Sequence, residues 1–211
     1  DVEGYDACRK IAILSSLMSG KNVKYEEIYT EGITKVTKED FLYAKKMGLS
    51  IKLLASVRYE DGAYYAMVAP FLVGEDNPLH GVNDVFNAIF IRGNTLGDSM
   101  YYGRGAGKLP TASAVVSDVI DCAKHGRKHI ICLWEDKKQP LADIGGACRR
   151  FFVRTEAGSD EKVSHLFGEV DRVDAGVPGE FGFLTGPLTE REFEEKAEAL
   201  EGFVSRLRVD A

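Results

Sequence analysis

The chain has 211 residues, of which 45% are hydrophobic, and a formal net charge of −6 at pH 7. This length allows one large domain or a medium domain with a small one, and the apolar content is sufficient for packed cores. The acidic balance, without a basic stripe, argues against nucleic acid as the main partner. The apolar runs are too short to cross a bilayer and none reads as a signal peptide, so we expect no membrane partner. The four cysteines lack CxxC spacing, which favours reduced thiols in a cytoplasmic protein.

The first quarter of the chain carries two helix signals. Between residues 5 and 18, apolar residues recur at helical spacing, and Gly20 follows as an end signal. The stretch TKEDFLYAKKMG begins with Thr37, a capping residue with Asp40 three places later, and ends at Gly48. We therefore expect one helix over residues 5–18 and a second between Thr37 and Gly48.

Two β-hairpins are predicted next. The segment SIKLLASVRYEDGAYYAMVAPFLV contains two β-rich runs joined by Asp61-Gly62, a typical hairpin turn. The segment VFNAIFIRGNTLGDSMYYG repeats the pattern, with Gly93-Asn94 as the turn. Helices combined with strands that arrive in hairpins predict an α+β fold, with a mixed or antiparallel sheet and helices on one face.

The second half predicts a further helix and then a small domain. The helix covers residues 110–123, with Pro110 near its first position. A connector with charged residues, Pro and Gly follows, and we place a domain boundary near Gly145. The remainder reads as strand, helix, two strands, helix and strand, the βαββαβ order of a ferredoxin-like unit. The predicted domains are therefore residues 1–144 and 145–211. Such a small unit often gains stability by pairing with a copy of itself, so we expect a homodimer or higher homo-oligomer.

The opening residues, DVEGYDACRK, are the densest group of candidate catalytic residues. Asp6 and Lys10 are four apart and share one face of the predicted helix. One interpretation is a catalytic lysine oriented by a carboxylate, with Asp1 as a second polar anchor, because a proton-transferring lysine needs a neighbour to orient it. The other is a surface ion pair worth about 0.3–0.5 kcal/mol. Spacing alone favours the surface pair and does not decide the question.

A glycine-rich loop lies within YYGRGAGKLPTASAVVSDVIDCA, residues 101–123. Gly103, Gly105 and Gly107 would let the backbone approach a bulky ligand, and the helix that follows offers free N–H groups at its start. A tight turn between a strand and a helix would use the same residues. No acidic residue follows at dinucleotide spacing, so this is not a complete Rossmann fingerprint.

No metal site is predicted. His125 and His129 are four apart, but the intervening residues include Gly126 and two basic side chains. No carboxylate or thiol stands at ligand spacing, which favours a solvated linker.

Four segments together resemble the homoserine dehydrogenases: DVEGYDACRK, EGITKVTKEDFLYAKKMGLSIKLLA, VNDVFNAIFIRGN and YYGRGAGKLPTASAVVSDVID. These segments cover about residues 1–123 in consecutive blocks. Members of that family interconvert aspartate semialdehyde and homoserine by hydride transfer with NAD(P)H. In them an N-terminal Rossmann domain carries most of the cofactor site, and the chain returns to it after the catalytic domain. The resemblance implies that residues 103–123 are this return. We therefore expect part of a longer enzyme, inactive by itself and binding no cofactor alone.

The resemblance also implies roles for single residues. Lys10 matches the lysine proposed to exchange a proton with the reacting oxygen. Asp6 matches a substrate-binding aspartate, and Asp1 another acidic residue of the active site. The cofactor would lie against Gly103, Gly105, Ala106 and Gly107.

The tail from Ala147 onward resembles an ACT-type regulatory domain. The segment TEAGSDEKV replaces the usual Gly-x-Leu loop after the first strand. ACT domains place amino-acid effectors at this loop, which implies threonine as a possible effector held by Gly158, Ser159 and Asp160. The alternative is that Asp160 merely caps its own helix.

A second class of function stays open from the sequence. The chain could be a non-catalytic module that binds an amino acid and dimerises. A Rossmann domain encoded immediately upstream would favour the enzyme over the module.

Overall fold

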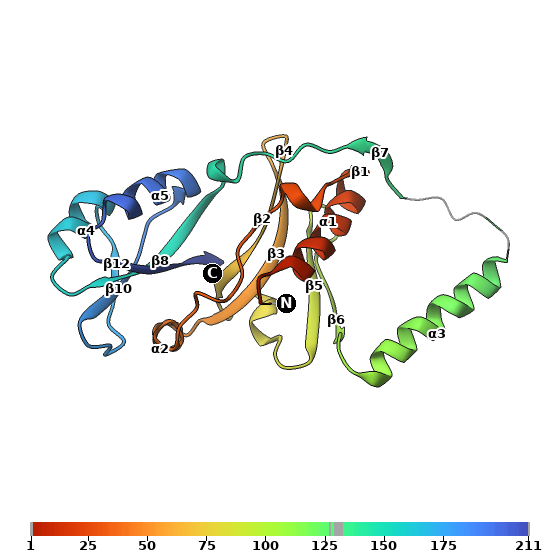
Figure 1. Cartoon of the computed structure of the whole chain (residues 1–211), viewed down its shortest axis with the longest axis horizontal. Helices are drawn as coiled ribbons and strands as arrows, with labels where there is room; N and C mark the ends of the chain where they lie inside the picture. The colour runs from red at the N-terminus through yellow and green to blue at the C-terminus, as the bar shows by residue number, and fades with distance from the viewer. Residues whose placement is uncertain (1, 127, 129–132, 211) are drawn as a thin grey trace. The chain divides into compact units, whose positions relative to one another are not determined.

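The computed structural model describes residues 2–126, 128 and 133–210 (Figure 1). The chain divides into two compact units, of which the larger joins Asp1–Gly74 to Leu133–Ala211 and the smaller is Glu75–Cys132. The predicted α+β class with a mixed sheet is confirmed. Among the described residues, no helix combines the length and apolar character that a membrane span requires.

The larger unit contains helices on both faces of a sheet. Its helices and 3-10 turns are α1 (Tyr5–Ser19), η1 (Tyr25–Glu27), α2 (Lys38–Met47), η3 (Ile144–Gly146), α4 (Asp160–Phe167) and α5 (Glu190–Ala199). Its strands are β1 (Lys21–Asn22), β2 (Tyr29–Thr30), β3 (Ser50–Glu60), β4 (Ala63–Val73), β7 (Glu135–Lys138), β8 (Cys148–Glu156), β9 (Asp171–Val173), β10 (Glu180–Leu184), β11 (Leu188–Thr189) and β12 (Phe203–Asp210). Strands β1 and β7 form a separate parallel pair.

The main sheet has eight strands in the order β2-β4-β12-β8-β10-β9, with β3 paired to β4 and β11 paired to β8. The segment from β8 to β12 has the predicted βαββαβ order, to which β11 adds two residues. Its strands β12-β8-β10-β9 are antiparallel, as in a ferredoxin-like unit. However, β12 also pairs in parallel with β4. One sheet therefore runs through both predicted domains, and the boundary at residue 145 stays a prediction.

Local sequence explains where the helices and the first hairpin begin and end. Thr37 and Asp40 form the predicted capping box of α2, and Gly48 ends that helix in the left-handed conformation. At the first hairpin turn, Asp61 and Gly62 have φ angles of 50° and 80°. Two consecutive positive φ angles match the right-handed twist of the flanking strands, so this predicted hairpin is confirmed.

The two faces of the sheet bury different sets of residues. On one face, Ala66 and Val68 pack with α1, and Leu72 packs with α2. Figure 1 shows α1 and α2 against this part of the sheet. On the other face, Phe151 and Val153 pack with α4 and α5. The alternation of β-strand side chains thus places α1 and α2 on one face, as expected, and α4 and α5 on the opposite face.

The smaller unit consists of a hairpin and a long helix. Its elements are η2 (Pro78–Gly81), β5 (Phe86–Gly93), β6 (Gly97–Arg104) and α3 (Lys108–His125). The predicted turn at Gly93-Asn94 starts one residue too early and ends two too early, because Gly93 still pairs with Gly97 and residues 94–96 make the turn. Helix α3 starts two residues before Pro110, since Gly107 serves as its N-cap.

A buried arginine joins α2 to the sheet of the larger unit. Arg154 of β8 donates to Asp40 Oδ1 and Thr37 Oγ1, each at 2.8 Å. Its Nε and Nη2 atoms donate to the two carboxylate oxygens of Glu180 at 2.9 and 2.8 Å. Burial opposes the charge of Arg154, but the hydrogen bonds to Glu180 and Asp40 outweigh it and raise the pKa of Arg154.

A second group of buried ions surrounds β12. Arg208 donates to both oxygens of Glu190, at 2.6 and 2.8 Å, and to Glu31 at 2.8 Å. Arg206 donates to both oxygens of Glu31, at 3.0 and 2.9 Å, and to Glu194 at 3.2 Å. We call these five residues together with Arg149 the β12 ion cluster.

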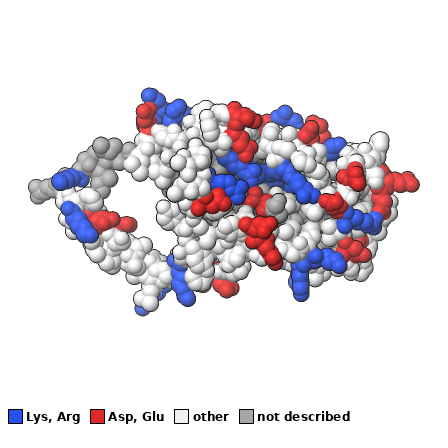
Figure 2. Space-filling view, turned by 180° about the vertical axis from the view of Figure 1, so that it is seen from behind, with Lys and Arg blue, Asp and Glu red and all other residues white. Residues whose placement is uncertain are grey.

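Arg149 adds a third guanidinium to the β12 ion cluster. Its Nε atom lies 3.4 Å from Glu190 Oε1, and its guanidinium lies over the Phe71 ring. Burial and the charge of Arg58 lower the pKa of Arg149 to about 10. Figure 2 shows basic side chains in a row on this side of the larger unit, with acidic side chains beside them. Charges of both signs therefore balance one another here instead of forming a patch of one sign.

Replacing Arg154 with Ala is expected to lower the free energy of unfolding by about 3–5 kcal/mol, because two carboxylates would stay buried without their partner. Arg150→Ala on the same strand is the matched control, since Arg150 is 42% exposed and pairs with the exposed Asp171. The control should cost less than about 1 kcal/mol. Urea denaturation of both variants checks this, and equal losses would contradict it.

The charge of Glu31 makes stability depend on pH in acid. Burial opposes its ionisation, but the charges of Arg206 and Arg208 outweigh burial and lower the pKa of Glu31 from 4.5 to about 2. A lowered pKa in the folded state stabilises the protein above pH 4.5, and this contribution is lost as the pH falls from 4.5 towards 2. The free energy of unfolding is expected to fall by an amount on the order of 2 kcal/mol. This is less than the full pKa shift would give, because solvent partly screens the charges at this site.

Unfolding free energies of Glu31→Gln and the wild type between pH 7 and pH 2 measure this contribution. The difference between the two proteins should shrink as the pH falls through that window. A difference that stays constant with pH would contradict the assignment.

Candidate active site

Helix α1 carries the predicted catalytic pair on its outward face. Its inward face buries Cys8, Ile11, Ala12, Ser15 and Ser16. Asp6 and Lys10 lie on the opposite side, and the helix begins at Gly4, whose φ of 82° requires glycine in practice. The packing of the inward face therefore determines where Asp6 and Lys10 point.

The structure brings Asp6 and Lys10 together. Lys10 Nζ lies 2.7 Å from Asp6 Oδ2, and the two side chains are 67% and 56% exposed. The hydrogen bond and the charge of Lys10 lower the pKa of Asp6. The contact fits both interpretations, because a proton-transferring lysine needs such a neighbour and an exposed surface ion pair has the same geometry. Asp1, the third predicted catalytic residue, lies outside the described residues.

The glycine loop belongs to the smaller unit. Gly103 is the last residue but one of β6 and pairs with Asn87, and Gly105 and Ala106 lead into α3. A Cβ atom on Gly105 would meet the Asn87 side chain, with its Cγ at 2.7 Å, and Gly107 has a φ of 119°. The loop conformation therefore favours glycine at position 107, whereas a side chain at position 105 would only have to displace that of Asn87.

The start of α3 fits an anionic group. Gly107 is the N-cap, and no side chain accepts from the first N–H groups of the helix. The N–H groups of Lys108 and Leu109 are therefore without a side-chain cap, whereas Pro110 has no N–H. Uncapped N–H groups at a helix N-terminus favour an anionic group such as a phosphate.

The predicted effector residues lie between β8 and α4. Ser159 is the N-cap of α4, and its hydroxyl donates to the Glu201 carbonyl at 3.4 Å. Asp160 is the first residue of the helix and forms an ion pair with Arg172 of β9. The alternative that Asp160 caps its own helix is wrong, because that position belongs to Ser159. Gly158, with φ of 91°, makes the turn before the cap.

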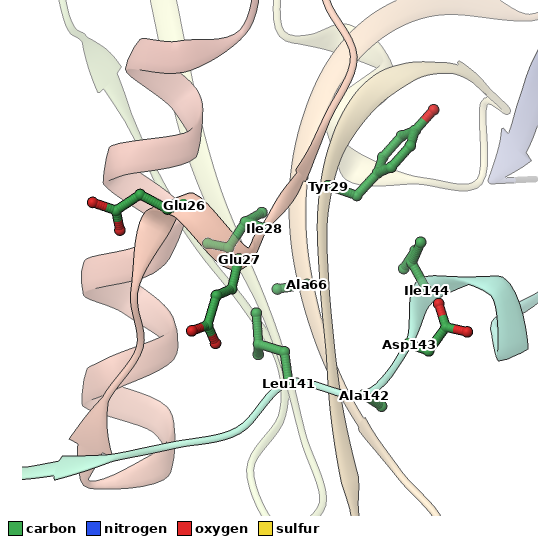
Figure 3. Close-up of a pocket in the computed structure, with 9 residues that line it drawn as sticks. All are labelled: Glu26, Glu27, Ile28, Tyr29, Ala66, Leu141, Ala142, Asp143 and Ile144. Atoms are coloured by element: carbon green, nitrogen blue, oxygen red, sulfur yellow. The ribbon is translucent and has the colours of Figure 1, made fainter.

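A surface hollow of about 460 Å³ lies beside β2 and η3, and none of the described candidate site residues lines it (Figure 3). Its lining includes the acidic residues Glu26, Glu27 and Asp143. Glu27 is paired with Lys138 at 2.6 Å, and Asp143 is paired with Arg191. Two of these three carboxylates therefore already have cationic partners.

Among the residues that the structure describes, no group of three or more His, Cys, Asp or Glu side chains could hold a metal ion. His125 Nδ1 lies 2.7 Å from the Asp121 carbonyl oxygen, and His129 is outside the described residues. Cys8, Cys122 and Cys148 are free thiols, and Cys132 is likewise outside.

The family model for homoserine dehydrogenase matches residues 1–120, more than half of the chain. The chain belongs to the homoserine dehydrogenase family. The match covers α1 with Asp6 and Lys10, both hairpins, the glycine loop and most of α3.

Relatives and solved structures extend the likeness to the rest of the chain. A homoserine dehydrogenase of Bacillus subtilis is 35% identical over 176 residues, which are 80% of this chain and 41% of the relative. One from Synechocystis is 50% identical over 125 residues, covering 57% of this chain and 29% of the relative. The crystal structure of a homoserine dehydrogenase from Thiobacillus denitrificans covers all of this chain with a TM-score of 0.84 and 29% identity. This chain covers 54% of that structure and thus about half the length of such a family member.

The β12 ion cluster is not predicted by the sequence pattern. The signal was present in the stretch FVSRLRV, where Arg206 and Arg208 alternate with apolar residues along a predicted strand. Alternating arginines along a strand indicate that one face of the strand is charged. The carboxylates that pair with these arginines come from distant segments of the chain. Glu31, 175 residues before Arg206, has no sequence signal of its own.

Proposed function

We propose that this chain contributes the substrate-binding and proton-transfer part of a homoserine dehydrogenase, which interconverts L-aspartate 4-semialdehyde and L-homoserine. The observation that carries the proposal is the exposed Asp6–Lys10 pair, 2.7 Å apart within the segment that the family model matches. An exposed ion pair contributes little to stability, so its placement on the open face of α1 favours a role towards a ligand.

The proposed chemistry follows from the two charges. In the reducing direction the Lys10 ammonium polarises the aldehyde oxygen and gives it a proton as the carbonyl carbon is reduced. In the oxidising direction neutral Lys10 takes the proton from the homoserine hydroxyl. The Asp6 carboxylate binds the α-ammonium of the substrate and holds the lysine in position. Asp1 is proposed as a further acidic residue of the same site.

NAD(P) supplies the hydride in this proposal. Gly103, Gly105, Ala106 and Gly107 would hold its pyrophosphate, with the first N–H groups of α3. The exposed apolar residues of α3 support a further role for this helix. Val115, Val116 and Val119 are 56–62% exposed along one side of it. We assign this stripe to contact with the remainder of the cofactor domain, without which the chain would not turn over homoserine.

We further propose that the domain boundary lies at residue 145 and that residues 145–211 have an ACT-like role. The same proposal includes a cytoplasmic location and self-association of the protein. Exposed apolar side chains on the β5–β6 hairpin, Ile89, Ile91 and Met100 among them, support association with a second copy. The non-catalytic alternative would use this surface and the tail, but it gives no role to the Asp6–Lys10 pair.

Replacing Lys10 with Ala in the longer enzyme that contains this chain should lower kcat by about 10²–10⁴-fold, because general acid–base catalysis is lost. Asp6→Asn should in addition raise KM for homoserine. Arg9→Ala is the matched control, since Arg9 is an exposed cation on the same helix that lies over the Tyr25 ring. Steady-state kinetics of the three variants test this, and near-normal turnover of Lys10→Ala would favour a surface ion pair.

Threonine is expected to bind to the tail through Asp160, which would exchange Arg172 for the effector ammonium. Calorimetry of this chain with threonine should give saturable heat. Asp160→Ala should weaken binding about tenfold or more, as expected for a lost hydrogen bond to a charged group. Glu161→Ala is the control, because Glu161 lies in the same first helical turn. If millimolar threonine gave no heat, residues 145–211 would have a purely architectural role.

A further inference from the structure

Glu31 lies where two strands share one side of β4. Strand β2 pairs in parallel with β4 at Met67 and Val68, and β12 pairs in parallel with it from Phe71 onward. The Glu31 N–H donates to the Val68 carbonyl at 2.8 Å, directly after the end of β2. The backbone of Glu31 therefore occupies the gap along β4 between the end of β2 and the paired part of β12.

The side chain of Glu31 points to the face of the sheet that carries the β12 ion cluster. Its carboxylate accepts from Arg206 at 3.0 and 2.9 Å, from Arg208 at 2.8 Å and from the Tyr29 hydroxyl at 3.0 Å. It is 16% exposed. Two guanidinium groups thus hold this one carboxylate, and charge-assisted bonds of this kind are the strong ones.

The backbone next to Glu31 supports the residues that precede α1. The Ile33 N–H donates to the Val2 carbonyl at 2.8 Å. A Cβ atom on Gly32 would collide with the Val2 carbonyl and would lie 2.6 Å from Glu3 Cα, so Gly32 lets the two backbones touch. A Cβ atom on Gly4 would likewise lie 3.6 Å from the Glu31 carbonyl oxygen. The loop after β2 is therefore packed directly against the Val2–Gly4 turn.

Helix α1 begins on that turn. Gly4 caps it without a side-chain acceptor, and the Cys8 N–H donates to the Gly4 carbonyl at 2.9 Å. Asp6 is the second residue of the helix and Lys10 stands one turn later. A displacement of the turn would consequently move the first helical turn and the carboxylate that orients the lysine. Misplacement of a catalytic group by about 1 Å can reduce rates on the order of 100-fold.

We propose that Glu31 is a positioning residue for the Asp6–Lys10 pair, acting through the loop after β2 and the Val2–Gly4 turn. This proposal rests on the function proposed above. In it, Arg206 and Arg208 of the C-terminal strand hold the carboxylate, and the Gly32 backbone transmits that position to the start of α1.

Glu31→Gln tests the proposal, because glutamine keeps the shape of the side chain and loses its charge. Glu194→Gln is the matched control, since Glu194 also binds Arg206 but lies on α5, away from the loop after β2. In this chain, amide hydrogen exchange at Cys8 and Ile33 should become about tenfold faster in Glu31→Gln than in Glu194→Gln, as expected for local opening. The Gly20 amide, bonded to Ser16 at the far end of α1, should be accelerated less than Cys8 and Ile33, because it responds only to the loss of overall stability. Equal acceleration at all three amides would indicate a loss of overall stability alone and would overturn the proposal.

The second measurement uses the longer enzyme. Glu31→Gln should lower kcat/KM for homoserine about 10- to 100-fold, as for a misplaced catalytic group, and Glu194→Gln should stay within about twofold of the wild type. Arg206→Gln removes one of the two guanidinium groups that bind the Glu31 carboxylate and leaves Arg208. It should give an intermediate loss of kcat/KM, and it replaces Glu31→Gln in this test if that variant does not fold.

The kinetic outcomes separate the two proposals. If Lys10→Ala abolishes turnover while Glu31→Gln and Arg206→Gln behave like Glu194→Gln, the positioning role is overturned and the proposed function stands. If Lys10→Ala itself turns over normally, the proposed function fails. Amide exchange, which needs no activity, then still decides whether Glu31 fixes the start of α1.

Discussion

Buried arginines that need carboxylates from distant segments are the constraint on which the larger unit depends. Arg208 is almost fully buried in β12, and a charge removed from water must be paired to be tolerated. Its partners are Glu190 of α5 and Glu31, which follows β2. Arg154 imposes the same requirement through Asp40 of α2 and Glu180 of β10. Neither the N-terminal nor the C-terminal segments can therefore move away alone without leaving ions buried and unpaired. Apolar packing drives the assembly, and these pairs define which segments must meet.

The buried ions that hold the larger unit together are separate from the exposed Asp6–Lys10 pair on α1. The β12 ion cluster lies on the face that carries α4 and α5, and Arg154 and Asp40 are buried between the sheet and α2. Asp6 and Lys10, by contrast, are exposed on the outward side of α1. An exposed pair gains little from Coulomb attraction in water and stays available to a substrate. In the proposed function, a substrate and the remainder of the cofactor domain would exclude water from this pair and strengthen it.

Local signals predicted most of the elements, and the long-range pairing could not be predicted from them. The capping box at Thr37, the Asp61-Gly62 turn and the βαββαβ order are properties of neighbouring residues, and the structure confirms them. The turn after Gly93 and the start of α3 were each misplaced by one or two residues, because Gly97 and Gly107 decide those ends. The Asp6–Lys10 contact followed from helical spacing. The position of β12 between β4 and β8 depends on pairing across more than 130 residues, for which the sequence holds no local signal.

The position of β12 also affects how the chain can fold while it is being synthesised. Because β12 lies between β4 and β8, both of these strands keep a row of unpaired N–H and C=O groups until residues 203–210 have left the ribosome. Pairings between residues so far apart form slowly, and open strand edges favour association with other chains in the meantime. The edges of β4 and β8 that face β12 are thus covered later than the pairings among the strands that precede β12 in the chain.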